Sequence, residues 1–224
     1  MSKIKIAIQG ELGAYSHIAA ENLYKGAEIK TCTTFEETFK QAYKDSNYKI
    51  VIPIENSLAG RVADIHYLLP KYKLQIHGEH FQNVEHNLLS KQNAAIDDIK
   101  FIRSHAQAIG QCQNLINKRK FKPIISADTA GSAKDLAEGD DKSIAAIASE
   151  LSAKIYNLKI LEKNIEDEKG NVTRFLVMGK NIEQPEFVSK KKFITSCIFR
   201  VKSEPSALYK CLGGFATNQV NLTK

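Results

Sequence analysis

The most informative part of this sequence is the segment Asn171–Phe175 (NVTRF), which directly precedes the apolar run Leu176–Met178. A hydroxyl and a guanidinium at the edge of an apolar strand are hard to explain by core packing, because burying polar groups without partners costs free energy. Side chains alternate across a strand, so Thr173 and Phe175 should share one face and Arg174 the other. If Arg174 also faces a binding site, the backbone must bend or bulge there.

Four further motifs of the same kind occur where the chain is expected to leave a strand. They are Gly10–Ser16, Pro53–Ser57, Ser104–Gln107 and Asp128–Gly131. In open α/β sheets, ligands bind in the crevice outside the carboxyl ends of the strands. Five such ends with hydroxyl, amide or glycine groups therefore predict one shared cleft.

Three neutral polar residues add detail to that cleft. Ser104 and Gln107 could cap the helix that follows them, and Gln111 falls one turn later on the same face. Hydroxyl and amide groups suit a ligand whose carboxylates are bound by hydrogen bonds rather than by ion pairs. His105, within the same motif, is more often a structural residue than a catalytic one.

Each of these motifs also has a structural interpretation. Gly10 and Gly13 form a tight turn, or they offer backbone N–H groups to an anion at a helix start. Asn56-Ser57 is compatible with a cap and a turn, and Asp128-Thr129 indicates first a helix N-cap. The sequence signals no strong nucleophile and no Ser-His-Asp arrangement.

The elements that must position these residues alternate between strands and helices. Continuous apolar strands such as Ile50–Ile54 are typical of a parallel sheet that is covered on both faces. Alternating β and α segments predict a mostly parallel sheet with helices on both sides. Leu74–Leu89 holds two β-like runs close together, which we interpret as strands that cross to a second lobe. Strands are expected at 3–9, 29–33, 50–54, 101–103, 123–126, 144–148 and 173–178.

The C-terminal part of the chain has a different pattern. Residues 181–192 are polar, include Pro185, and are expected to form a linker. Phe193–Val201 alternates like a strand, a helix should run from Pro205 to about Asn218, and another strand should start at Val220–Leu222. A β-α-β fragment of about 30 residues does not readily bury its own core. We therefore expect either a truncated module or a segment that pairs with another copy, and a homo-oligomer is the favoured assembly.

Composition excludes several classes of protein. The 224 residues are 43% hydrophobic, enough for a packed core. No stretch approaches the roughly 18 apolar residues of a membrane span. The net charge of +7 requires that a nucleic-acid partner be considered, but the basic residues are scattered and seldom alternate with aromatic ones. A generally basic surface, which also attracts a dianionic metabolite, is the favoured interpretation.

The cysteines and the N-terminus predict the compartment. The four cysteines are far apart and form no C-x-x-C pair, as in a reduced protein without a zinc site. The first strand starts almost at Met1, which leaves no room for a signal peptide. We expect a cytoplasmic protein without membrane, metal or cofactor.

Taken together and in this order, the five motifs resemble the prephenate dehydratase family, whose plant relatives act on arogenate. Further matching stretches are Gly78-Glu79, Ala145–Ser149 and Asn164–Asp167. The resemblance implies a two-lobed α/β fold like that of type 2 periplasmic binding proteins. It places the catalytic domain at 1–180, with lobes at about 1–77 plus 165–180 and at 78–164. Residues 193–224 resemble the first half of an ACT regulatory domain, which in the family binds phenylalanine and supports oligomers.

The resemblance also implies the reaction and the roles of the motif residues. The family removes the ring hydroxyl of prephenate as water and the ring carboxylate as carbon dioxide, which gives phenylpyruvate in phenylalanine biosynthesis. Thr173 would be the proton donor or orient it, and a poor acid such as a hydroxyl favours a hydrogen-bonding or relay role. Substrate would be bound by Asn56, Ser57, Ser104, Gln107, Gln111, Thr129, Arg174 and Phe175.

Some positions depart from the family pattern. His17 stands where the family usually has an acidic residue, and Ala106 stands where it usually has proline. Ser206 replaces the usual glycine of the regulatory domain. The alternatives that stay open are an arogenate dehydratase, a non-catalytic binding module for an aromatic or keto acid, and, on charge alone, a nucleic-acid binder.

Overall fold

The structure is a computed structural model that describes residues 3–181, 186, 188–190 and 193–222. It consists of two compact units, Met1–Glu183 and Gln184–Lys224. Most of the expected linker at 181–192 lies outside the described residues. None of the helices within the described ranges has the length and apolar character needed to cross a membrane.

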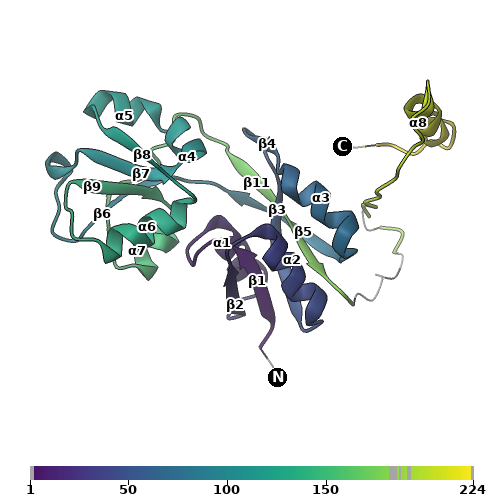
Figure 1. Cartoon of the computed structure of the whole chain (residues 1–224), viewed down its shortest axis with the longest axis horizontal. Helices are drawn as coiled ribbons and strands as arrows, with labels where there is room; N and C mark the ends of the chain where they lie inside the picture. Colours follow the sequence, from purple (N-terminus) through teal and green to yellow (C-terminus); the bar gives the residue numbers. More distant parts are fainter. Residues whose placement is uncertain (1–2, 182–185, 187, 191–192, 223–224) are drawn as a thin grey trace. The chain divides into compact units, whose positions relative to one another are not determined.

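The first lobe is built on a sheet with strand order β2-β1-β3-β11-β5, and β4 pairs with β3. β1 is parallel to β2 and β3, whereas β11 is antiparallel to both of its neighbours (Figure 1). Helices α2 and α3 pack on one face of this sheet, and α1 packs on the other. The elements are β1 (Lys5–Gln9), α1 (Tyr15–Leu23), β2 (Glu28–Cys32), α2 (Phe35–Lys44), β3 (Tyr48–Asn56), β4 (Gly60–Arg61), α3 (Ala63–Tyr72), β5 (Gln75–Asn83) and β11 (Val172–Gly179).

The second lobe is built on a sheet with strand order β10-β6-β9-β7-β8. β7 is parallel to β8 and β9, whereas β6 is antiparallel to both of its neighbours. Helices α4 and α5 cover one face, and α6 and α7 cover the other. The elements are β6 (Asn87–Ser90), the 3-10 helix η1 (Ile96–Asp98), β7 (Phe101–His105), α4 (Ala106–Gly110), α5 (Gln113–Arg119), β8 (Lys122–Ser126), α6 (Thr129–Glu138), β9 (Ile144–Ala148), α7 (Glu150–Ile155) and β10 (Lys159–Glu162).

The two sheets repeat one arrangement. In each, three successive strands are parallel with the first in the middle, and the fourth position holds an antiparallel strand. The two-lobed α/β class expected from the sequence is therefore confirmed.

Helices α2, α6 and α7 begin at side-chain caps. The Thr34 hydroxyl accepts from the N–H of Glu37, and Asp128 accepts from the N–H of Gly131. The Ser149 hydroxyl accepts from the N–H of Ser152 at the start of α7. Such caps satisfy backbone donors that a helix start leaves unpaired.

The chain crosses between the lobes twice. The first crossing is Val84–His86, so it lies later than the expected boundary at 77/78, because β5 pairs with β11 as far as Asn83. The second crossing runs from Lys163 to Asn171. Within it, the N–H of Ile165 donates to the carbonyl of His86 at 2.9 Å, and the N–H of Val84 donates to Asn171 at 2.8 Å.

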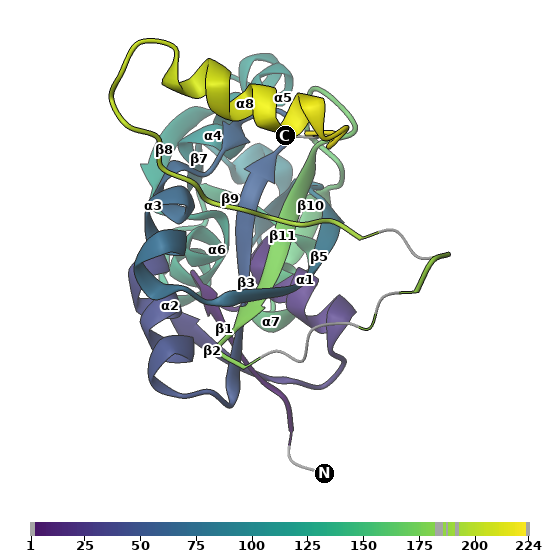
Figure 2. The same cartoon turned by 90° about the vertical axis from the view of Figure 1, so that its right-hand side faces the viewer.

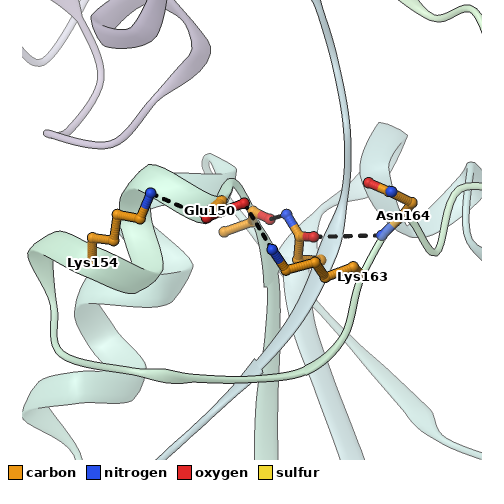
Figure 3. Close-up of polar contacts among 6 residues, drawn as sticks. Glu150, Lys154, Lys163 and Asn164 are labelled. Atoms are coloured by element: carbon orange, nitrogen blue, oxygen red, sulfur yellow. Dashed lines mark hydrogen bonds and ion pairs between the residues drawn. The ribbon is translucent and has the colours of Figure 1, made fainter.

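Side-chain contacts attach the start of the second crossing to α7. Lys163 and Lys154 both lie 3.1 Å from the carboxylate of Glu150, on opposite sides of it (Figure 3). The N–H of Asn164 donates to the side chain of Asn87 at 3.4 Å. All of these groups belong to the second lobe or to the crossing, so these contacts hold the start of the crossing against the second lobe.

The C-terminal unit contains one helix, α8 (Ala207–Thr217), within the residues that the structure describes. The expected helix is present, but the strand expected at Phe193–Val201 is wrong for this chain, because residues 193–201 form no strand and are exposed. Val220–Leu222 likewise forms no strand. A strand needs a neighbour for its backbone N–H and C=O groups, and alternation of side chains alone does not supply one.

Candidate functional site

Thr173, near the start of β11, pairs with Asn56, the last residue of β3. The two strands lie side by side in Figure 2. The Asn56 amide nitrogen donates to Thr173 Oγ1 at 2.9 Å and to Asn171 Oδ1 at 2.6 Å. Thr173 is 9% exposed, so the residue is nearly enclosed. The register between the two strands shifts between Arg174 and Phe175, which is the irregularity expected if Arg174 faces the site together with Thr173.

The turn after β3 fixes the orientation of the Asn56 amide. The backbone N–H groups of Leu58 and Ala59 donate to Asn56 Oδ1 at 3.0 and 2.9 Å. Backbone nitrogens can only donate, so the oxygen of Asn56 faces the turn and its nitrogen faces Thr173. Ser57 joins the same turn to β11, since its Oγ accepts from the N–H of Val172 at 2.9 Å.

The polar contacts continue from Asn171 to the second lobe. Asn171 Nδ2 donates to Gln111 Oε1 at 3.0 Å, and His86 Nε2 lies 2.9 Å from the same oxygen. The Tyr15 hydroxyl lies 3.1 Å from His86 Nδ1 and donates to the carbonyl of Glu85 at 2.6 Å. We call the connected side chains the amide chain; they are Thr173, Asn56, Asn171, Gln111, His86 and Tyr15.

Asn171, His86 and Tyr15 were not among the predicted site residues, although Asn171 and Tyr15 stand in two of the five motifs. Asn171 stands in the NVTRF motif, and His86 lies in the predicted crossing. Their contacts with Gln111, however, join segments that are far apart in the sequence. Hydrogen-bond partners of this kind follow from tertiary structure alone.

The titratable groups of the amide chain are held neutral. Burial lowers the pKa of His86, and the Gln111 contact and Glu166 act weakly in the opposite direction. Burial, with the nearby Glu166, raises the pKa of Tyr15 well above its usual value. At neutral pH the chain is therefore a set of uncharged hydrogen-bonding groups.

The second lobe contributes the remaining neutral residues. Ser104 is fully buried at the end of β7 and donates to the carbonyl of Ile147 at 2.7 Å. Gln107 is exposed on α4, and Thr129 is half-buried at the first position of α6, after the cap Asp128. These residues lie at or just after the carboxyl ends of β7 and β8, whereas Asn56 follows β3 in the first lobe.

Arg174 and Phe175 occupy different surroundings from Thr173. The Arg174 guanidinium forms an ion pair with the Glu79 carboxylate of β5, with nitrogen–oxygen distances of 2.6 and 2.8 Å. Phe175 is 2% exposed and packs in the core beneath α1. That burial indicates a supporting role for Phe175, which holds the backbone of Thr173 and Arg174, rather than contact with a ligand.

The turn at Gly10–Gly13 joins the lobes instead of presenting its N–H groups to an anion. The Gly13 carbonyl accepts from the hydroxyls of Ser149 and Ser152 at 2.6 and 3.1 Å, and the Gly13 N–H donates to His17 Nδ1. Tyr156 donates to the carbonyl of Leu12 at 3.0 Å. We call Gly13 with Ser149 and Ser152 the glycine contact.

A cavity of about 570 Å³ lies between α1, the first crossing and α7. Its lining includes Tyr15 and Glu85 but none of the residues expected to bind substrate. The carboxylates of Glu21, Glu85 and Glu150 also line it, and Glu150 is paired with lysines. Lys154 is the one lysine among the lining residues, so the three carboxylates leave the lining net negative, and this cavity does not suit a dicarboxylic acid.

The fold and the site define a class of protein. Two α/β lobes joined by two crossings hold neutral hydrogen-bonding groups at their strand ends, as in proteins that bind a small polar ligand between lobes. No cluster of three or more potential metal ligands occurs among the residues that the structure describes.

Known proteins narrow this class. A family model described as prephenate dehydratase matches residues 6–183. The bifunctional N-acyl-homoserine lactone acylase/prephenate dehydratase of Komagataeibacter europaeus is 40% identical over 221 residues, 98% of this chain and 78% of that protein. The chloroplastic arogenate dehydratase/prephenate dehydratase 2 of Arabidopsis thaliana is 39% identical over 223 residues, 100% of this chain and 58% of that protein. This chain belongs to the prephenate dehydratase family.

A solved structure agrees at the level of the fold. The prephenate dehydratase of Arthrobacter aurescens, in complex with L-Phe, superposes with a TM-score of 0.85 at 24% identity, over 99% of this chain and 75% of that one. The chain spans 78% of the length of the Komagataeibacter protein and 58% of that of the Arabidopsis protein, so both relatives are longer than the sequence described here.

Proposed function

We propose that this chain is a cofactor-free prephenate dehydratase, a carbon–oxygen lyase. The electron pair of the bond to the ring carboxylate forms the new ring double bond as carbon dioxide leaves. The ring hydroxyl departs from the opposite end of the ring system and takes up one proton to become water. The products are phenylpyruvate, carbon dioxide and water, and aromatisation supplies much of the driving force.

The observation that carries this proposal is the hydrogen bond from Asn56 to Thr173 Oγ1. Because Asn56 donates, the Thr173 oxygen acts as acceptor there and its own proton is available to another acceptor. A departing hydroxyl is such an acceptor. A hydrogen bond accepted by Thr173 also makes its O–H a better donor.

The remaining residues bind and orient the substrate in this proposal. Ser57, Gln107, Gln111 and Thr129 supply hydroxyl and amide groups from both lobes, and Arg174 supplies a positive charge that Glu79 partly offsets. Ser104 was expected to bind substrate, but it is fully buried and its hydroxyl donates to the Ile147 carbonyl, so it supports the site from the core. Positioning is the larger part of the task, because the reaction is unimolecular and needs one well-placed donor. Of the two sites, the one at Thr173 suits a dicarboxylate better than the cavity beside Glu21 and Glu85.

The test is a turnover assay with purified protein, prephenate and detection of phenylpyruvate. Turnover well above the acid-catalysed background is expected, and its absence with folded protein would contradict the proposal. Stabilisation by phenylpyruvate without turnover would instead indicate a binding module.

The substrate class is tested by a comparison with arogenate. Prephenate and arogenate differ only in a keto or amino group on the side chain, and we propose prephenate as the preferred substrate. A higher kcat/KM for arogenate would reverse this assignment and leave the reaction type unchanged.

The C-terminal unit suggests further properties of the same enzyme. We propose that residues 193–222 contribute to a homo-oligomer, because Ile194, Ile198, Phe199 and Leu208 are exposed apolar side chains. Phenylalanine would act as an effector where the regulatory module is complete, and we propose a cytoplasmic location. No nucleic acid or membrane partner is proposed.

A further inference from the structure

We infer that Asn171 is a positioning residue, which accepts one proton of the Asn56 amide so that the other is directed to Thr173, while its own amide nitrogen sets the tautomer of His86 through Gln111. This inference rests on the proposed function for its kinetic part and on the protein alone for its tautomer part. It assigns one direction to every hydrogen bond between Asn56 and His86.

The direction starts at the backbone. Leu58 and Ala59 donate to Asn56 Oδ1, so the two protons of Asn56 Nδ2 point away from the turn. One goes to Thr173 Oγ1 and the other to Asn171, which must therefore present its oxygen, at 2.6 Å. No other orientation avoids placing two donors or two acceptors face to face.

The same rule passes from Asn171 to the second lobe. With its oxygen facing Asn56, Asn171 presents its nitrogen to Gln111, so Gln111 must present Oε1, at 3.0 Å. His86 Nε2 lies 2.9 Å from that oxygen and must therefore carry a proton. The neutral imidazole is then the Nε2–H tautomer. Its Nδ1 is an acceptor 3.1 Å from the Tyr15 hydroxyl, whose single proton it shares with the Glu85 carbonyl at 2.6 Å.

Burial makes this order effective. Asn171 and His86 are 3% and 2% exposed, so water competes little for their hydrogen bonds. In a buried polar chain, a mismatched pair leaves both groups unsatisfied, which costs more than the bond itself contributes. The turn at Leu58 thus determines the tautomer of an imidazole that lies beyond three intervening side chains.

Two variants separate the two tasks of Asn171. Asn171→Asp still accepts from Asn56 but has no proton for Gln111, so the Gln111 amide should turn and present its nitrogen to both neighbours. His86 Nε2 must then accept, and His86 becomes the Nδ1–H tautomer. Asn171→Ala removes the acceptor for Asn56 and leaves that amide less constrained.

The tautomer is read by long-range proton–nitrogen correlation NMR of nitrogen-15-labelled protein at about pH 8, above the usual titration range of histidine. The His86 signals are identified as those that disappear in His86→Gln. We expect Nε2–H in the natural sequence and Nδ1–H in Asn171→Asp. An Nδ1–H tautomer in the natural sequence, or no change in Asn171→Asp, would overturn the assigned directions.

The kinetic test uses the same proteins with prephenate. Asn171→Ala should lower kcat about tenfold, the effect of one hydrogen bond lost in the transition state. Asn171→Asp should recover most of kcat, with a higher KM because its charge repels the dianion. An unchanged kcat in Asn171→Ala, or equal losses in both variants at equal melting temperature, would refute the positioning role.

The NMR and kinetic experiments distinguish a failure of this inference from a failure of the proposed function. If the natural protein did not turn over prephenate, the proposed function would fail, while the NMR result would still confirm or refute the assigned directions. If turnover is present and the tautomer is wrong, only the present inference fails.

Discussion

Two of the contacts between the lobes of this protein, the amide chain and the glycine contact, are built differently. The amide chain joins them by side chain to side chain, through Asn171 and Gln111. The glycine contact joins them by side chain to backbone, since Ser149 and Ser152 both donate to the Gly13 carbonyl. A backbone carbonyl accepts from any donor at the right distance, whereas each amide in the chain must face one way.

The two contacts have different effects: one limits the distance between the lobes, and the other sets the direction of the hydrogen bonds. The glycine contact sets how closely the lobes approach, because a Cβ on residue 13 would lie 2.4 Å from the Ser152 hydroxyl. The amide chain sets which way the protons point at Thr173. Changes at the first contact should therefore act mainly on stability and substrate binding, and changes at the second on the rate of the chemical step.

The largest effect is expected at the end of the amide chain. Thr173→Val keeps the shape of the side chain and removes the hydroxyl, so kcat should fall by about 10²-fold or more, as for the loss of a positioned proton donor. Thr173→Ser keeps the hydroxyl and should retain much more of the rate. Steady-state kinetics with prephenate and melting temperatures measure both, and a near-normal kcat in Thr173→Val would remove Thr173 from the mechanism.

The second prediction concerns the glycine contact. Gly13→Ala places a methyl group 2.8 Å from the Ser152 Cα, with a backbone φ of +91°. The matched control is Gly26→Ala, whose φ of +73° is also positive but whose Cβ meets nothing within 4 Å. Gly13→Ala should lower the free energy of unfolding by about 1–3 kcal/mol more than the control, and it should raise KM.

Urea unfolding of both glycine variants measures this difference. Equal losses in the two variants would mean that only the backbone conformation matters and that the lobes do not press on residue 13.

The third prediction concerns pH. Burial lowers the pKa of His86 from its usual 6.5, so between 6.5 and that lowered value the unfolded chain binds a proton that the folded chain does not. The contribution of the neutral His86 to the free energy of unfolding is therefore fully present above pH 6.5. It decreases as the pH falls below 6.5 and does not change further below the pKa of the folded state. His17 and His77 also have lowered pKa values and act in the same sense.

His86→Gln isolates the share of this one imidazole, because glutamine can still donate to Gln111 but does not titrate. The loss of melting temperature between about pH 7.5 and pH 5.5 should be smaller in this variant than in the natural sequence. An identical loss in both proteins would assign the pH dependence to other groups.

The smallest effect on catalysis is expected in the C-terminal unit, which contains neither contact. Ile198→Glu places a charge on an exposed apolar side chain and should weaken self-association while kcat stays unchanged. Ser203→Glu adds the same charge at a polar position of this unit and serves as control. Sedimentation over a range of concentrations measures the change, and equal association of the two variants would argue against an interface at residues 193–201.

Much of the fold could be predicted because its signals are local. The apolar strand at Ile50–Ile54 and the caps at Thr34 and Asp128 each depend on a few neighbouring residues, and the structure has them. The strands expected at 193–201 and 220–222 failed because a strand requires a partner that local alternation does not reveal. In the site, Asn56 and Thr173 were identified by their motifs, and the structure places them in contact.

The links through Asn171 and His86 could not be predicted in the same way. They join residues 56, 86, 111 and 171, and no pattern in the sequence indicates which amide faces which. The inter-lobe role of Gly13 was also missed. In the sequence, a glycine that is required by a close neighbour such as Ser152 cannot be distinguished from a glycine that is required only by a tight turn.

The two crossings have a mechanical consequence. They are hydrogen-bonded to each other through Val84 with Asn171 and through His86 with Ile165, and the His86 N–H also donates to the Glu166 carboxylate at 2.9 Å. Because the two crossing segments are hydrogen-bonded to each other, we expect them to bend and twist together, which restricts the motions of one lobe relative to the other. Since Asn171 and His86 lie on these two crossings and both contact Gln111, we expect a rotation of the lobes to disturb those contacts, which would couple opening of the site to alignment of the donor.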